Sequence, residues 1–144
     1  MKRIIFLLLV LFAFNSCSKD AGNGPAVYYE LVPIQRCSMP YRFTAGQTYE
    51  FEMTYRQPSS CHFYKGIYFE KLPGNVRLVA IQCGVMESNS CVTYPVNSTS
   101  APNPQKETYQ FTAEAGEPYT FRIWSGKDDQ GENTYYDVVV PVDN

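Results

Sequence analysis

The 144-residue chain has a single histidine, His62, and no C-x-x-C pair of cysteines. Zinc sites are clusters of cysteine and histidine at short spacings, so this scarcity argues against a zinc site. Basic runs are also missing, since twelve Lys and Arg stand against fourteen Asp and Glu. Nucleic acid is therefore not expected as a partner. No apolar run reaches the ~20 residues that a membrane-spanning helix needs.

The longest apolar run, residues 4–14, follows Lys2 and Arg3 and ends shortly before Cys17. A basic start and a short apolar run predict a cleaved export signal. With Ser16 as the small residue before Cys17, the segment resembles the signal of bacterial lipoproteins. That resemblance implies cleavage before Cys17 and a lipid on its sulfur. In that family, an Asp directly after the cysteine favours retention at the inner membrane. This chain has Ser18 at that position, which implies the outer membrane. Phe14 and Asn15 match the family less well, and an ordinary secretory signal is the alternative.

These features divide the chain into a signal peptide (1–16), a lipidated tether (17–26) and one domain (27–144). The tether is rich in Gly, Asn and Asp, which bury little apolar surface. The domain has no convincing helical periodicity. Its aromatic and β-branched runs, separated by Pro and Gly, predict an all-β fold. The seven expected strands cover residues 27–35, 48–56, 63–72, 76–82, 108–113, 119–124 and 135–142. A long loop is expected over residues 84–107.

Two of these strands begin with the same pattern, A-G-x-x-Y-x-F, at residues 45–51 and 115–121. We expect both strands to begin at the same end of one sandwich. Seven short strands and a tyrosine-corner pattern at Tyr119 resemble the immunoglobulin-like domains. The resemblance implies an antiparallel sandwich in which strands 63–72, 119–124 and 135–142 are neighbours. Phe51 and Phe121 stand in the strands where antibody domains carry cysteines, so the resemblance is to the broad group.

Four cysteines remain after Cys17, and an even number in an exported chain predicts two disulfides. In the expected topology, each of the three possible ways of pairing the four cysteines leaves two paired cysteines far apart. Closing a short loop costs the least entropy, which favours Cys83–Cys91 and leaves Cys37–Cys61.

Catalytic chemistry finds little support in the sequence. Cys61 and His62 are adjacent, but neighbours on a strand point to opposite faces and do not readily hydrogen-bond. There is no G-x-S-x-G motif. The acidic residues Asp128, Asp129, Glu132 and Asp137 lack the spacing of a calcium loop and suit a solvated hairpin tip. We therefore expect no enzyme activity, no metal and no cofactor.

A set of outward-facing aromatic side chains is the main functional signal. Strand parity points five side chains outward: Tyr64, Tyr68, Arg122, Trp124 and Tyr135. The strand neighbours that the immunoglobulin-like resemblance implies would bring these five together on one outer face. Tyr, Trp and Arg dominate binding hot spots, and flat aromatic rings also stack on sugars. Two alternatives are that the loop after Cys83 covers this face, and that the tyrosines only stabilise the sheet.

The sequence thus predicts a cell-envelope lipoprotein, anchored by lipid to the outer membrane on its periplasmic or outward side. Its expected role is a non-catalytic binding or adhesion module for a protein or carbohydrate ligand. The alternative is an envelope inhibitor of a protease or lysozyme, presenting the Cys83–Cys91 loop or residues 125–134. A hydrolase with an unrecognised site is the third hypothesis.

Overall fold

The computed structural model describes residues 25–95 and 104–143. Cys17 and the expected signal lie outside these ranges. The described residues form strands and no helix, so they include no helical segment that could cross a membrane. The all-β prediction is confirmed. In chain order the strands are β1 (Val27–Val32), β2 (Ile34–Ser38), β3 (Phe43–Thr44), β4 (Thr48–Tyr55), β5 (His62–Leu72), β6 (Val76–Met86), β7 (Gln105–Thr112), β8 (Tyr119–Lys127), β9 (Asn133–Val140) and β10 (Val142–Asp143).

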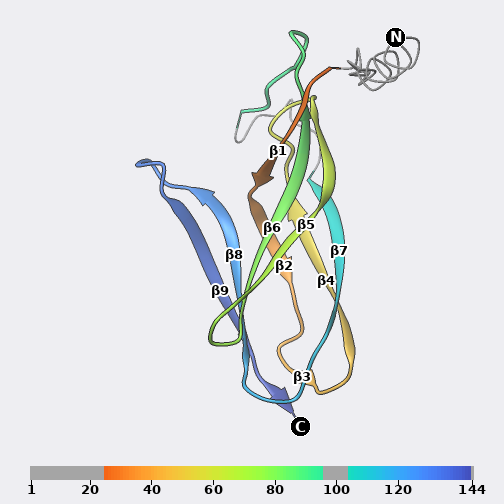
Figure 1. The fold of residues 1–144 in the computed structure, drawn as a ribbon, viewed down its shortest axis with the longest axis vertical. Coiled ribbons are helices and arrows are strands. Elements are labelled where there is room, and N and C mark those ends of the chain that lie inside the picture. The colour runs from red at the N-terminus through yellow and green to blue at the C-terminus, as the bar shows by residue number, and fades with distance from the viewer. Residues whose placement is uncertain (1–24, 96–103, 144) are drawn as a thin grey trace, which may run out of the picture.

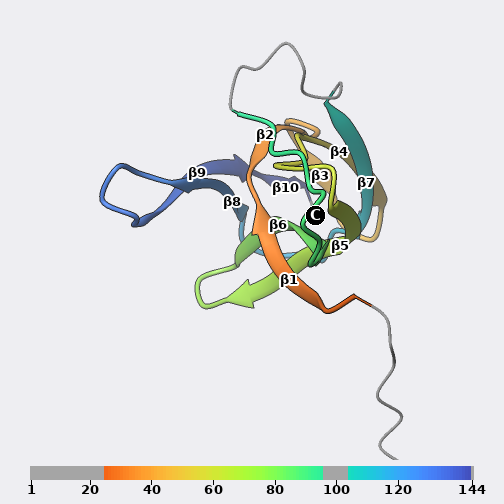
Figure 2. The same ribbon diagram turned by 90° about the horizontal axis from the view of Figure 1, so that it is seen from above.

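The larger sheet contains five strands, with β6 at its centre. β5 pairs with β6 over Val76–Val85, so β1 and β8 must share the other edge of β6. β8 runs parallel to β6 over Val76–Val79, and β1 runs antiparallel to it over Ile81–Met86. β9 completes the sheet beyond β8. Because β8 and β1 occupy successive stretches of one edge, they diverge, and the tip of the β8–β9 hairpin stands away from the body (Figures 1 and 2).

The second sheet has the order β2-β4-β7 and packs against the first. A short parallel pair, β3 with β10, closes the end near the C-terminus. Alternating burial along β4 shows the expected two-residue period: Phe51, Met53 and Tyr55 are buried, while the residues between them are only partly covered. The structure is thus the sandwich that the sequence predicts.

Aromatic rings fill the middle of the core. Phe51 of β4 and Phe121 of β8 are fully buried and meet edge to face, with their ring centroids 5.1 Å apart. Phe43 and Phe111 pack against both rings. Edge-to-face contacts of this kind stabilise a core beyond the area that they bury. The two sheets are therefore joined at this level by aromatic packing.

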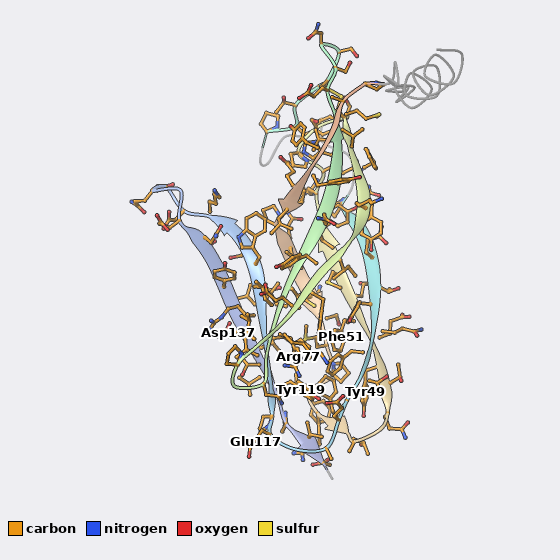
Figure 3. The ribbon with its side chains drawn as sticks, in the orientation of Figure 1. Tyr49, Phe51, Arg77, Glu117, Tyr119 and Asp137 are labelled. Atoms are coloured by element: carbon orange, nitrogen blue, oxygen red, sulfur yellow. A yellow bond between two sulfur atoms is a disulfide. The ribbon has the colours of Figure 1, made fainter. Side chains whose placement is uncertain are left out.

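The repeated A-G-x-x-Y-x-F pattern forms two equivalent turns. The hydroxyl of Tyr49 accepts a hydrogen bond from the Thr44 N–H at 2.7 Å, and that of Tyr119 accepts one from the Glu114 N–H at 3.0 Å. Gly46 and Gly116 provide the positive φ that each turn needs. Tyr49 and Tyr119 lie at the same end of the sandwich, as Figure 3 shows. The expectation that both strands begin at one end is confirmed.

The detailed immunoglobulin-like arrangement is not confirmed. It placed β5, β8 and β9 side by side and antiparallel. β8 and β9 do pair antiparallel, but the prediction that β5 neighbours β8 is wrong. β6 lies between β5 and β8, and its pairing with β8 is parallel. The physical reason is the long β5–β6 hairpin, which makes β6 rather than β5 the strand that β8 can reach.

The predicted disulfides, Cys83–Cys91 and Cys37–Cys61, are both wrong in this structure. Cys61 pairs with Cys91, with their Cα atoms 5.5 Å apart, and Cys37 and Cys83 are free. β6 continues past Gln82 to Met86, so Cys83 lies within the strand with its side chain in the core. The segment after β6 then folds back beside the start of β5, where Ser59 bridges to Thr93. This brings Cys91 to Cys61.

Candidate functional site

The outward surface of the five-stranded sheet, here called the outer face, gathers most of the exposed hydrophobic side chains. Strand register defines it, because residues paired across two strands point to the same side. Leu31 pairs with Gln82, Phe63 with Gly84 and Tyr68 with Ala80, all on the side opposite the buried Val79, Ile81 and Cys83. On the neighbouring hairpin, Trp124 pairs with Tyr135 on the same side.

Eleven large hydrophobic side chains among the described residues are exposed, and eight belong to the outer face. The eight are Val27, Tyr29, Leu31, Phe63, Tyr68, Met86, Tyr135 and Val139. The most exposed of them is Val139, at 62%. Scattered surface hydrophobics are ordinary in soluble proteins, but their concentration on one sheet face makes that face the candidate interaction surface.

Trp124 lies on this face, yet only 8% of it is exposed. Its side chain lies where the pairing of β8 with β6 ends and the pairing of β1 with β6 begins. A cavity of about 50 Å³ remains there, bordered by Leu31, Tyr68 and Tyr135 among others. The indole N–H donates to Asn133 Oδ1 at 3.2 Å. Trp124 is therefore covered on the outer face, and the tyrosines around it are the exposed side chains there.

Tyr64 is the predicted face residue that the structure places elsewhere. Its ring lies on the core side, with its centroid 6.4 Å from that of Tyr55, and burial raises its pKa. The register of β5 shifts between Tyr64 and Gly66, which is a β-bulge. The extra residue reverses the alternation, so Tyr64 points inward while Tyr68 points outward.

Strand parity that points Tyr64 outward assigns its neighbour Phe63 to the core, but the bulge places Phe63 on the outer face. Its ring lies directly over Gly84 of β6, where an added Cβ would sit only 2.3 Å from Phe63 Cζ. Gly84 is therefore needed for this close approach. Tyr29 and Leu31 were also missed, because Pro33 obscured the alternation of the first strand.

The charged groups on the face are already paired. Arg122 forms two hydrogen bonds with Asp137, at 3.0 and 2.9 Å, which hold the pKa of Asp137 below its usual value. Tyr68 donates to Glu70 Oε2 at 2.6 Å, a bond that raises the pKa of Tyr68. Lys65 Nζ lies 5.7 Å from the centroid of the Tyr29 ring, within cation–π range. Arg122 thus contributes a neutralised ion pair rather than a free cation.

The acidic hairpin tip has a structural explanation. Asp128 Oδ1 accepts hydrogen bonds from the N–H groups of Gln130 and Glu132, both at 2.9 Å. These bonds shape the turn between β8 and β9. Among residues 25–95 and 104–143, no three acidic, cysteine or histidine side chains group in a way that could hold a metal ion.

Comparisons with known protein families, curated proteins and solved structures find no match for this chain.

Proposed function

We propose that this chain is an envelope lipoprotein whose sandwich binds a partner protein through the outer face. The observation that carries the proposal is the concentration of eight exposed hydrophobic side chains on that one surface. Removing such a surface from water is favourable by roughly 25 cal/mol for each Å² of apolar area. A partner that covers the outer face would gain this free energy.

A protein is favoured over a glycan by the chemistry of the face. Val27, Leu31, Met86 and Val139 lie among the tyrosines, and aliphatic side chains of this kind fit another protein's side chains better than a sugar ring. Sugars also need polar groups with free hydrogen-bonding capacity. On this face the Arg122 guanidinium and the Asp137 carboxylate are bonded to each other.

The lipid anchor belongs to the same proposal and rests on the N-terminal sequence. Residues 18–26 connect Cys17 to β1 and can span about 30 Å when fully extended. The outer face would then lie within a short distance of the membrane. Radiolabelled palmitate should enter the wild-type protein, and the Cys17→Ser variant should take up none. Equal palmitate labelling of the wild type and the Cys17→Ser variant would show that Cys17 is not the lipid anchor.

The binding proposal is tested with a triple variant, Tyr29→Ala/Tyr68→Ala/Tyr135→Ala. All three side chains are exposed, so their removal should leave the core intact. Tyr41→Ala is the matched control, because Tyr41 is 88% exposed and lies off the face. Tagged proteins are used to capture partners from envelope extracts, and each captured protein is then purified and titrated by calorimetry.

We expect a partner that binds the wild type and the Tyr41 control equally, and the triple variant at least tenfold more weakly. A partner with the same affinity for the triple variant would exclude the outer face. If the protein bound a glycan array and captured no protein partner, the ligand would be a carbohydrate and not a protein.

A further inference from the structure

A second site lies at the end of the sandwich where β1 begins and β6 ends. It is a pocket of about 770 Å³ between these strands and the segment that follows β6. Tyr28, Val85 and Met86 contribute apolar surface to it, while Ser59 and His62 contribute polar atoms. Cys91 also lines the pocket, so the disulfide to Cys61 fixes one wall.

Three side chains form a continuous hydrogen-bonded chain at this pocket. Ser59 Oγ lies 2.7 Å from His62 Nδ1, and His62 Nε2 lies 2.5 Å from Glu30 Oε1. Ser59 is in the turn before β5, His62 is the first residue of β5, and Glu30 comes from β1. The order is nucleophile, imidazole, carboxylate, which is the order of a catalytic triad.

The carboxylate determines which nitrogen of His62 carries the proton. An ionised Glu30 can only accept, so Nε2 of His62 must be the donor to it. In neutral imidazole the proton on Nε2 leaves Nδ1 with a lone pair, and Nδ1 therefore accepts from the Ser59 hydroxyl. This is the tautomer that a general base requires. The His62 side chain is only 8% exposed, which holds the ring in this orientation.

We propose that Ser59 is the nucleophile of an esterase site, with His62 as general base and Glu30 as the residue that positions His62. The expected substrates are small esters whose acyl group carries no charge. The apolar walls suit a short acyl or aryl group, and Glu87 at the pocket together with Glu30 disfavours an anionic one.

The reaction balances with water as the second substrate. Ser59 Oγ attacks the ester carbonyl while its proton passes to His62 Nδ1, and the carbonyl electrons move to oxygen. The C=O bond re-forms, the C–O bond to the alcohol breaks, and the alcohol takes the proton from Nδ1. Water then adds to the acyl–Ser59 carbon and gives one proton to Nδ1. Ser59 Oγ leaves with that proton, and a carboxylic acid is released.

The same contacts would also suit a purely structural turn. Ser59 Oγ accepts the Cys61 N–H at 3.2 Å, the Ser59 carbonyl accepts the His62 N–H at 3.2 Å, and Ser59 is only 7% exposed. A structural serine would not react with an acylating or phosphonylating reagent, whereas an activated one would. Reactivity therefore separates the two roles.

The test treats the full-length protein with a fluorophosphonate probe and locates the adduct by mass spectrometry. We expect an adduct on Ser59 and none in Ser59→Ala. The His62→Gln variant should be labelled at least about 100-fold more slowly, which is the scale of general-base catalysis. Ser60→Ala is the matched control, because the neighbouring Ser60 Oγ accepts the Val92 N–H and takes no part in the chain. It should be labelled like the wild type.

Hydrolysis of p-nitrophenyl acetate gives the second measurement. Glu30→Gln should lower kcat about tenfold with little change in KM, and Glu30→Asp should recover part of the loss. A wild-type protein that stays unlabelled while melting cooperatively would overturn the proposal. So would an adduct on any residue other than Ser59. The adduct site in the wild type decides the matter even if Ser59→Ala does not fold.

Discussion

Cys37 and Cys83 are free thiols in a domain whose other two described cysteines are paired. Burial raises the pKa of Cys37 to about 12 and, with the nearby charge of Glu30, raises that of Cys83 to about 11. The thiolate is the reactive form of cysteine, so both thiols should be inert in the folded protein. Cys83 behaves as a core side chain rather than as half of a disulfide.

Thiol counting tests this assignment. In a Cys17→Ser variant, Ellman's reagent at pH 8 should find no fast-reacting thiol in the folded protein and two after denaturation. Reduction should raise the count to four. The pairing that loop closure favoured would give none after denaturation without reductant, a result that would contradict the structure.

The same two thiols make stability depend on pH. Their folded pKa values lie above the ordinary value of 9.0, so the folded state keeps protons that the unfolded state releases. The contribution of these two thiols to the free energy of unfolding is therefore fully present below about pH 9. It is lost as the pH rises toward 11 and 12. Urea unfolding at pH 8 and pH 10 should show the decrease, and Cys37→Ala should reduce it.

At the level of single elements, the two-residue period predicted most strands. It succeeded for β4 because Tyr49, Phe51, Met53 and Tyr55 alternate without interruption. It failed within β5, where one bulge at Lys65 reversed the alternation, exchanging the faces of Phe63 and Tyr64. A bulge adds a residue without changing composition, so no sequence pattern revealed it. The end of β6 was missed because Cys83 and Gly84 resemble the start of a loop.

The twin tyrosine turns supply a prediction for elements. Tyr119→Phe removes the acceptor for the Glu114 N–H beside a ring that is almost fully buried, and it should cost about 1–2 kcal/mol. Tyr49→Phe should cost less, because Tyr49 is half-buried and water can replace the lost bond. Urea unfolding measures both, with Tyr135→Phe on the exposed face as the control. Equal effects in all three variants would show that the hydroxyls do not hold the turns.

For the whole molecule, the decisive feature is the shared edge of β6. Because β8 and β1 follow one another along that edge, Trp124, Leu31 and Tyr135 meet there. The sequence placed Tyr68, Arg122, Trp124 and Tyr135 on one surface, and the structure agrees for these four. The sequence could not indicate that Trp124 would be covered, because that depends on β1 and β8 meeting beside β6. The result is a broad outer face in which exposed tyrosines surround a buried tryptophan.

Hydroxyl-radical footprinting of the protein with its captured partner tests the binding role of the outer face most directly. Oxidation is measured residue by residue in the free and bound states, without any mutation. We expect binding to protect Tyr29, Tyr68 and Tyr135 severalfold and to leave Tyr41 unchanged. Protection of Tyr41 or Val92, with the three face tyrosines oxidised as before, would contradict it.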